Sequence, residues 1–389
     1  MEPGGSERAL AHLDGLRGLA AVVVACHHFA CAFLPAAVFG AVATPHFEAE
    51  RWIHNSPLQL LVAGNFAVCI FFVLSGYVLS HKFFVTGDVI HLQSGAVRRY
   101  FRLAGPIMAA VALGYMVYAL GLTHHLEAAR LSFSDMWLAK LWPGEISLVE
   151  AIKQGVYGAV LGRGDPSSIN NVLWTMKIEF LGSFLTFGTL ALVGRLRHRW
   201  WVYVVLGALF FKSYYLAFIL GWALCDLNTT QIRAWVSHWV LWLGLGLGLV
   251  LGSLPLAGGE ARLFGNFALP YLTADQEFVL IHILGAALVM LAVTRLPWLR
   301  RGLGTKGFRV LGRLSFSLYL VHIPLLGSLA CWLLFTSVPR FGYAMALAMA
   351  FVAWALACAL LAWVFERLID RTSVRGSRQI WRRYFARTT

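Results

Sequence analysis

The sequence predicts an all-α integral membrane protein with about ten transmembrane helices in a single membrane domain. Hydrophobic residues make up 59% of the 389 residues and charged residues only 13%, against roughly 25% charged in a typical soluble protein. A water-soluble surface cannot be built from so few charges. The apolar stretches also repeatedly reach the ~20 residues that a helix needs to cross a hydrocarbon core of ~30 Å. The distribution of basic residues along the chain supports the same fold class.

Ten apolar stretches have about the length of a membrane-spanning helix. The first follows an N-terminal segment without a clear signal-peptide cleavage site, so we interpret it as a membrane helix. The fifth and sixth are short and almost contiguous, so they form either a bent hairpin or one long span. The expected spans are residues 13–34, 58–80, 104–122, 170–194, 199–211, 213–226, 234–254, 277–294, 312–334 and 341–365.

Lysine and arginine are distributed unevenly between the segments that join these spans. With the N-terminus in the cytoplasm, the inside segments hold 23 of these residues and the outside segments hold eight. Because cytoplasmic loops of membrane proteins are enriched in Lys and Arg, this asymmetry predicts an N-in, C-in topology. Basic loops that meet anionic lipid then account for the net charge of +14, and nucleic acid is not an expected partner.

Two segments lie outside the expected spans. Residues 123–168 form a long outer segment with an amphipathic or re-entrant stretch at 142–162, and long ordered loops are often functional, so we expect it to cover a site. Residues 366–389 carry seven arginines interleaved with aromatic and aliphatic residues, which is typical of a segment on the inner leaflet. The predicted organisation is a transmembrane domain over residues 1–365 and a basic cytoplasmic tail over residues 366–389.

The first span carries ionisable residues, which are costly in a membrane and usually face a cavity or a partner. Arg17 and His28 are eleven residues apart, which places them on one helix face and ~16 Å apart along the axis. Asp14 is spaced to pair with Arg17, whereas His27 points to a different side from His28. Imidazole can act as the general base of an acyl transfer. A buried structural histidine, with Arg17 snorkelling to the interface, explains the same pattern.

Two further clusters of charge lie at the third and fourth spans. Arg99 and Arg102 share a helix face just before the third span, and forked guanidinium groups suit phosphate; a plain topology signal also explains them. The fourth span holds Lys177 and Glu179, with Trp174 nearby. Glu179 needs a donor, and Arg17 or a histidine across the bundle is the expected one. A structural clamp and a catalytic role both remain open for this carboxylate.

The ninth span places Tyr319 and His322 on one face, three residues apart. His322 is the stronger candidate, because hydroxyls such as those of Ser315 and Ser317 are often only interhelical hydrogen bonds. The six cysteines lie in or beside apolar stretches, so we interpret them as small apolar residues rather than disulfides. Histidines and cysteines at metal-ligand spacing are not found, so no metal site is expected.

Five segments resemble motifs of the acyltransferase 3 family, and they occur in the family's order over about residues 10–326. LDGLRGLAAVVVACHHF has the family's basic residue, ten others and a histidine, here Arg17 and His28. FFVLSGYVLS, which contains Ser75, is similar to the second-span motif, and FILGWALCDL (218–227) also looks familiar. RRYFR, LWTMKIEF and SFSLYLVHIPLL resemble the arginine pair, the Trp-and-Glu motif and the Ser-Leu-Tyr-Leu motif with its His-x-Pro. The chain departs from the family at Cys69 and Ile70, where many members have an acidic residue, and at Lys177.

The resemblance implies that an acyl group, often acetyl, moves from acyl-CoA to a hydroxyl of a glycan, lipid or small-molecule acceptor, as in polysaccharide modification. It implies a multi-pass protein of the plasma (inner) membrane in which His28 is the base, Arg17 is its partner, and the arginine pair contacts the phosphates of CoA. The alternatives are a transporter or exporter of glycan or lipid, and a non-enzymatic sensor of acyl donors. A transporter needs neither the Arg–His spacing nor the arginine pair, and turnover separates an enzyme from a sensor. The predicted site comprises catalytic His28, Arg17, Glu179 and His322; donor-binding Arg99, Arg102 and Tyr319; and substrate-binding or structural Asp14, Ser75 and Trp174.

Overall fold

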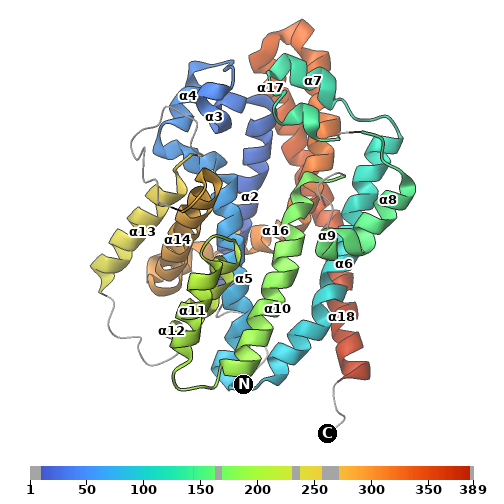
Figure 1. Ribbon diagram of the computed structural model, residues 1–389. Helices are drawn as coiled ribbons and strands as arrows, with labels where there is room; N and C mark the ends of the chain where they lie inside the picture. The colour runs from blue at the N-terminus through green and yellow to red at the C-terminus, as the bar shows by residue number, and fades with distance from the viewer. Residues whose placement is uncertain (1–9, 143, 163–168, 230–236, 256–270, 386–389) are drawn as a thin grey trace.

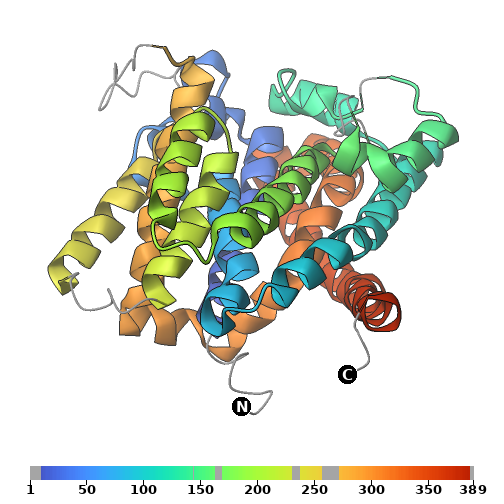
Figure 2. The same cartoon turned by 60° about the horizontal axis from the view of Figure 1, so that its bottom comes forward.

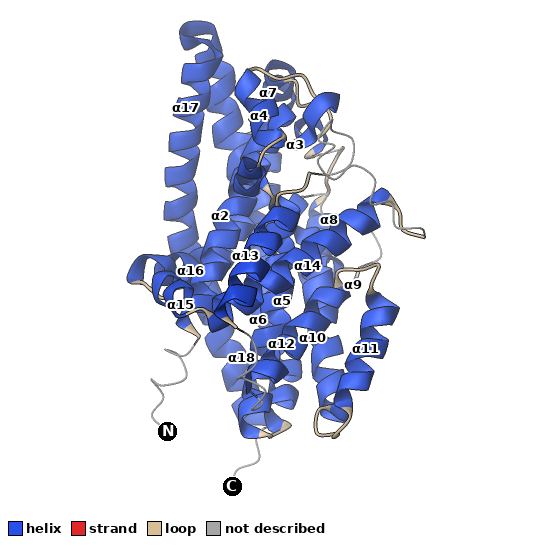
Figure 3. Ribbon diagram, turned by 90° about the vertical axis from the view of Figure 1, so that its left-hand side faces the viewer, coloured by secondary structure: helices blue, strands red, loops and turns tan. Residues whose placement is uncertain are grey.

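The computed structural model describes residues 10–142, 144–162, 169–229, 237–255 and 271–385 (Figure 1). Within these ranges the regular elements are helices and no strand occurs, as the colouring of Figure 3 makes plain. The predicted all-α fold is therefore confirmed for the described part of the chain. Six helical stretches are long and apolar enough to cross a membrane, so the protein is a multi-pass membrane protein.

The long helices correspond to most of the expected spans. They are α2 (Ala11–Phe33), α5 (Gly64–Thr86), α6 (Ile90–Ala119), α10 (Trp174–Val193, preceded by a 3₁₀ turn from Asn171), α14 (Ala274–Arg295) and a continuous stretch, Lys306–Tyr384. This stretch contains α16 (Lys306–Leu325), α17 (Cys331–Phe365) and α18 (Arg371–Tyr384), joined by π-helical turns at Leu326–Ala330 and Glu366–Asp370.

Three further apolar helices are shorter, namely α11 (Arg199–Phe210), α12 (Tyr215–Thr229) and α13 (His238–Gly252). At 1.5 Å per residue, helices of this size fall short of a ~30 Å hydrocarbon core. All ten expected spans thus coincide with helices, although residues 234–236 of the seventh lie outside the described residues. The count of ten crossings stays a prediction.

Several helix boundaries differ from those expected. A 3₁₀ turn over Pro57–Val62 occupies the start of the second expected span, so α5 begins only at Gly64. The third helix begins fourteen residues earlier than expected, because the basic segment before the apolar stretch continues the helix of α6. At the start of the tenth expected span the helical course breaks at Gly342, which has φ +74°, a conformation that glycine adopts without steric cost.

Shorter helices cover one end of the bundle, which we call the distal end. There lie α3 (Pro35–Phe39), α4 (Glu48–His54) and α7 (His125–Ser132) (Figure 1). The opposite, basal end carries the first turn of α2, the short α15 (Pro297–Leu303) and the end of α18 (Figures 1 and 3). The first described helix therefore begins, and the last described helix ends, at the same end of the bundle, as the expected topology requires; the side of the membrane that this end faces stays a prediction.

The two segments expected outside the spans are both partly helical. The outer segment forms α7, a 3₁₀ turn at Leu138–Lys140, then α8 (Leu148–Lys153), a π-helical turn (Gln154–Gly158) and α9 (Ala159–Leu161). The tail continues α17 as a helix, and α18 packs against α6 beside the bundle (Figure 2). Its position on a leaflet stays a prediction.

Glycines set the close packing of the helices that carry the motifs. A Cβ at Gly76 of α5 would come within 2.2 Å of the Phe218 carbonyl oxygen, and one at Gly221 of α12 would come within 2.2 Å of the Val73 carbonyl oxygen. Small residues of this kind let membrane helices approach at backbone distance. The segments FFVLSGYVLS and FILGWALCDL are therefore two halves of one helix contact.

Candidate active site

Helices α2 and α16 run side by side and bring two histidines together. A Cβ at Gly312 would lie 2.1 Å from the Asp14 carbonyl oxygen, and one at Gly18 would lie 2.5 Å from the Gly312 nitrogen, so the two backbones touch near the basal end. Further along the same pair of helices, His28 Nδ1 lies 2.9 Å from His322 Nε2. His322 is fully buried, whereas His28 is partly exposed. Two residues predicted separately thus form one hydrogen-bonded pair.

The surrounding carbonyl groups fix the direction of this hydrogen bond. His322 Nδ1 lies 3.0 Å from the Leu318 carbonyl oxygen. A carbonyl oxygen only accepts, so His322 Nδ1 carries the proton and its Nε2 is the acceptor in the neutral ring. His28 Nδ1–H is then the donor of the pair, and His28 Nε2 keeps a free lone pair. This tautomer is the one that a general base requires.

The outer segment covers His28. The ring of Trp137 stacks on that of His28, with 5.4 Å between ring centroids and 26° between the planes. Ser134 anchors the segment to α2, because its hydroxyl donates to the Cys31 carbonyl oxygen at 2.7 Å. His27 points elsewhere, as expected, and its Nδ1 donates to the Val62 carbonyl oxygen at 2.7 Å.

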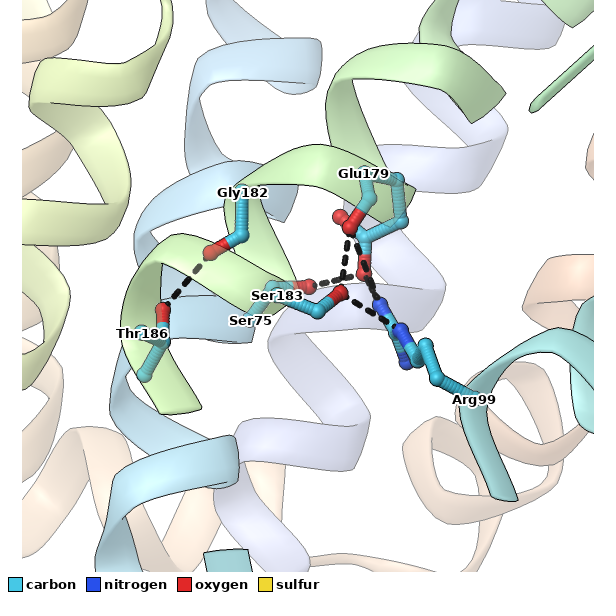
Figure 4. A network of polar contacts seen from close by, with 6 residues as sticks. All are labelled: Ser75, Arg99, Glu179, Gly182, Ser183 and Thr186. Carbon is cyan, nitrogen blue, oxygen red and sulfur yellow. Dashed lines mark hydrogen bonds and ion pairs between the residues drawn. The ribbon is translucent and has the colours of Figure 1, made fainter. Parts of the chain in front are cut away.

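A second polar network joins three helices of the bundle (Figure 4). Glu179 of α10 forms an ion pair with Arg99 of α6 and accepts a hydrogen bond from Ser75 of α5 at 2.7 Å. Arg99 Nε also donates to Ser183 at 2.6 Å. The expected partner of Glu179, Arg17 or a histidine, is not the one found: Arg99 takes this place, because α6 packs against α10, and Arg17 pairs with Asp14 instead. Arg99 is 6% exposed, so its guanidinium is enclosed and its charge is balanced.

The other residues of the basic cluster behave differently. Arg102, three residues after Arg99, is exposed and forms no ion pair with any residue that the structure describes. Its electrostatic neighbours include Arg17 and Asp370. Arg17 forms the predicted ion pair with Asp14 at 2.7 Å, and it makes no hydrogen bond to His28. Arg102 is therefore the member of the arginine pair whose charge is open to a ligand.

Tyr319 and Trp174 lie at the junction between α16 and α10. The Tyr319 hydroxyl lies 2.7 Å from Thr175 Oγ1 and 3.1 Å from the Val172 carbonyl oxygen. The indole ring of Trp174 packs on Tyr214 at 5.4 Å. The Tyr319 contacts join α16 to the start of α10, and the Trp174 contact joins α10 to the residue directly before α12.

The departures from the family pattern have local explanations. Lys177 Nζ donates to the Gly162 carbonyl oxygen at 3.0 Å, so this ammonium group binds the end of the outer segment. Cys69 is fully buried in apolar packing, where an acidic side chain would need a partner. Among the described residues no group of three or more His, Cys, Asp and Glu is arranged to hold a metal ion.

Sequence reasoning missed three contributors. Trp137 lies in the outer segment, where no periodic pattern singles it out. Thr175 directly follows Trp174 in the Trp-and-Glu motif, so its contact with Tyr319 could have been considered from the sequence. His282 of α14 accepts a hydrogen bond from Asn65 at 2.8 Å, and a lone histidine in an apolar span was a signal that could have been followed.

Comparisons with known proteins place the chain in a family. A family model described as "Acyltransferase domain" matches residues 10–365. An O-acetyltransferase of Phomopsis amygdali is 27% identical, with 97% of this chain and 86% of the relative covered. An acyltransferase of Cochliobolus lunatus is 25% identical, with 82% and 83% covered. No solved structure gives a significant match. Because the family model spans nearly the whole chain, this protein belongs to the acyltransferase 3 family and is an acyltransferase enzyme.

Proposed function

We propose that this protein is a membrane-bound O-acyltransferase that moves an acyl group, acetyl in the first instance, from acyl-CoA to a hydroxyl group. The observation that carries the proposal is the free Nε2 of His28, which the hydrogen bond to His322 leaves unprotonated. The name of one relative, an O-acetyltransferase, supports an oxygen acceptor and an acetyl donor. The transporter alternative is not favoured, since the family and both relatives are named for acyl transfer.

In the proposed reaction His28 acts as a general base. Its Nε2 takes the proton of the acceptor hydroxyl as that oxygen attacks the thioester carbonyl carbon. The tetrahedral intermediate then collapses, the carbon–sulfur bond breaks, and the imidazolium returns the proton to the leaving thiolate. The products are an ester and free CoA. A positioned base of this kind contributes typically 10²–10⁴-fold to the rate.

His322 is proposed as a positioning residue. Its Nε2 accepts the Nδ1–H of His28, which fixes the tautomer and orients the ring, and it stabilises the imidazolium that forms during transfer. The backbone also holds His322 in place, because its Nδ1 donates to Leu318 and Trp354 donates to its carbonyl oxygen at 3.1 Å.

The donor is proposed to bind with its phosphates toward the basal end. Arg102 supplies an exposed guanidinium without an ion-pair partner in the described part of the chain, which suits phosphate. Arg17 lies near it and ~16 Å below His28 along α2, a span that an extended pantetheine arm would cover. Arg99 is proposed to support this site indirectly, since its guanidinium is held by Glu179 and Ser183.

The acceptor is proposed to be a hydroxyl of a glycan, lipid or small molecule that reaches His28 from the distal half of the bundle. Trp137 would then border both the acceptor and the base. Plasma-membrane location, with the basal end in the cytoplasm, belongs to the same proposal. A sensor that only binds acyl donors would show no turnover.

The test is acyl transfer by purified protein. Labelled acetyl-CoA is supplied with candidate hydroxyl acceptors, and CoA release and label incorporation are measured for wild type, His28→Gln and the matched control His198→Gln. His198 is exposed and distant in sequence from the motifs. Loss of both signals in His28→Gln alone is the expected result. Full activity in a folded His28→Gln protein would remove His28 from the reaction.

A further inference from the structure

A basic cavity of about 570 Å³ lies at the basal end, between the first turn of α2, α15 and the start of α16. Arg300, Arg301 and Arg309 line it together with His12, and none of the described lining residues is acidic. None of the three arginines forms an ion pair with a described residue. His12 is 6% exposed, and its ring makes no hydrogen bond within the described ranges. Three like charges gathered without a partner repel one another, so the cavity is suited to an anion.

The chemistry of the lining points to phosphate. Guanidinium groups bind phosphate through paired N–H donors, and they are less strongly hydrated than an ammonium group. The volume lies within the ~300–1,000 Å³ of small-molecule sites, so it accommodates a phosphate ester with a polar group attached rather than a bare ion.

The cavity also lies at the level of a membrane surface. Trp298 of α15 stacks on Trp242 of α13, with 5.1 Å between ring centroids and 12° between planes. Trp298 and Trp242 are both about half exposed, and Trp239, also on α13, is 80% exposed. Exposed tryptophans gather where the hydrocarbon meets the headgroups. The helix that supplies Arg300 and Arg301 is therefore placed among lipid headgroups.

An apolar groove of about 400 Å³ runs between α13 and α14; α14 leads into α15, and α13 contacts α15 through the Trp242–Trp298 stacking. Leucines such as Leu243, Leu247, Leu288 and Leu291 line it. Its basal end reaches Leu241 and Ala292, which pack with Leu296 directly before α15. A lipid acyl chain that extends from the headgroup level at this point would enter the leucine-lined groove.

We propose that the basic cavity binds the phosphate-bearing headgroup of an anionic phospholipid, and that an acyl chain of this lipid lies in the α13–α14 groove. The nucleotide end of acyl-CoA is the other source of phosphate. It is disfavoured because His12 and Arg17 point about 140° apart around α2 at 100° per residue, so the cavity opens on a different side from Arg102. Basic pockets between membrane helices are a known type of lipid site.

Lipid retention by the purified full-length protein tests the proposal. The protein in neutral detergent is incubated with phosphatidylglycerol or phosphatidylcholine, and bound lipid is counted by native mass spectrometry. The cavity variant is Arg300→Gln/Arg301→Gln/Arg309→Gln. The matched control, Arg375→Gln/Arg378→Gln/Arg382→Gln, removes the same charge from α18. Gel filtration and melting temperature establish that each protein is folded, and single Arg→Gln variants replace the triple one if it is not.

The expected result is at least a tenfold preference of wild type for phosphatidylglycerol, lost in the cavity variant and kept in the control. Equal losses in both variants would overturn the proposal, since any basic surface would then suffice. Adenosine 3′,5′-bisphosphate is added as a soluble probe that represents the nucleotide end of acyl-CoA. Its binding at the cavity, with lipid retention unchanged, would also overturn the lipid proposal. Unchanged retention in Leu247→Gln would remove the groove from the site. None of these binding measurements requires acyl transfer, so their outcome is independent of the proposed function.

Discussion

His28 and His322 meet because they stand in the same register on two parallel helices. Gly18 faces Gly312 across backbones in contact, and ten residues further along each helix (18 to 28, 312 to 322) the two histidine rings lie 2.9 Å apart. Residue numbers increase together on both helices, so α2 and α16 run parallel. The first motif and the Ser-Leu-Tyr-Leu motif are thus one structural unit, in which glycines set the spacing and histidines form the site.

Two substitutions of His322 distinguish a role in positioning His28 from a role in packing alone. In His322→Leu the acceptor for His28 Nδ1–H is lost, so we expect kcat to fall ~10–100-fold with KM for acyl-CoA little changed, within the range of a charge-assisted hydrogen bond. In His322→Gln the amide oxygen can accept the same proton, so most of kcat should return. Steady-state kinetics with both substrates provides the measurement. Equal losses in the Leu and Gln variants would assign His322 a packing role instead.

The contact at Gly312 should control both stability and rate. In Gly312→Ala the new methyl would lie 2.1 Å from the Asp14 carbonyl oxygen, which the backbone of α2 cannot avoid without moving. Overpacking of this kind costs ~1–3 kcal/mol, and it should also lengthen the histidine hydrogen bond and lower kcat. Gly307→Ala on the same helix is the control, because nothing lies within 4 Å of its Cβ position. Comparable melting temperatures and rates for the two variants would contradict the register argument.

The sequence was sufficient for the all-α membrane fold and for the charged and histidine side chains inside the spans, because apolar length and charge within spans are local properties; Trp137 and Thr175 were missed, and the roles of the site residues stay predictions. It also predicted the Asp14–Arg17 ion pair, which depends only on helical spacing. The joining of His28 to His322 was not predictable, since hydropathy says nothing about which helices are neighbours. Helix ends at Gly64 and Ile90 were misplaced because turn chemistry and continued helical hydrogen bonding, rather than hydrophobicity, decide where a helix begins.

The arginine pair shows a second limit of sequence reasoning. Helical spacing puts Arg99 and Arg102 on one face, which suggested one shared role. In the structure Arg99 is enclosed by Glu179 and Ser183, whereas Arg102 is exposed. A difference of three residues moves a side chain along the helix by ~4.5 Å, and at a helix that leaves the bundle this is enough to change its surroundings.

Removing one partner of the Arg99–Glu179 ion pair should be costlier than removing both. Glu179→Leu leaves a buried guanidinium without its counter-charge, and such losses amount to ~3–5 kcal/mol. The double variant Arg99→Met/Glu179→Leu replaces the pair by apolar side chains and should recover much of that stability. Thermal melting in detergent of the two single variants and the double one gives the coupling energy. A double variant as unstable as the sum of the singles would show that the pair acts independently.

Removing the Arg102 side chain should weaken the binding of acyl-CoA more than it slows the chemical step. Arg102→Ala removes an exposed guanidinium that has no ion-pair partner in the described part of the chain, so the fold should be little affected. Loss of a charge-assisted hydrogen bond to phosphate costs ~1.5–3 kcal/mol, so KM for acyl-CoA should rise ~10–100-fold while kcat stays within a few-fold. Arg98→Ala is the neighbouring control, since Arg98 Nε is bound to the Ser94 carbonyl oxygen. A fall in kcat at constant KM would move Arg102 from the donor site to the reacting groups.

Acidification should loosen the distal end through His46. Its ring stacks on Tyr343 at 3.6 Å and on Phe133 at 4.6 Å, and burial lowers its pKa below the usual 6.5. The neutral ring is therefore favoured in the fold, so its contribution to stability is present above pH 6.5 and is lost progressively as the pH falls below that value. Glu50, whose pKa burial raises, contributes with the opposite sign, because its neutral form is favoured in the fold as the pH falls. We expect the wild-type melting temperature to fall between pH 7 and pH 5.5, and His46→Phe, which stacks but does not titrate, to lose less. If the melting temperatures of wild type and His46→Phe fell equally with pH, groups other than His46 would be responsible for the acid sensitivity.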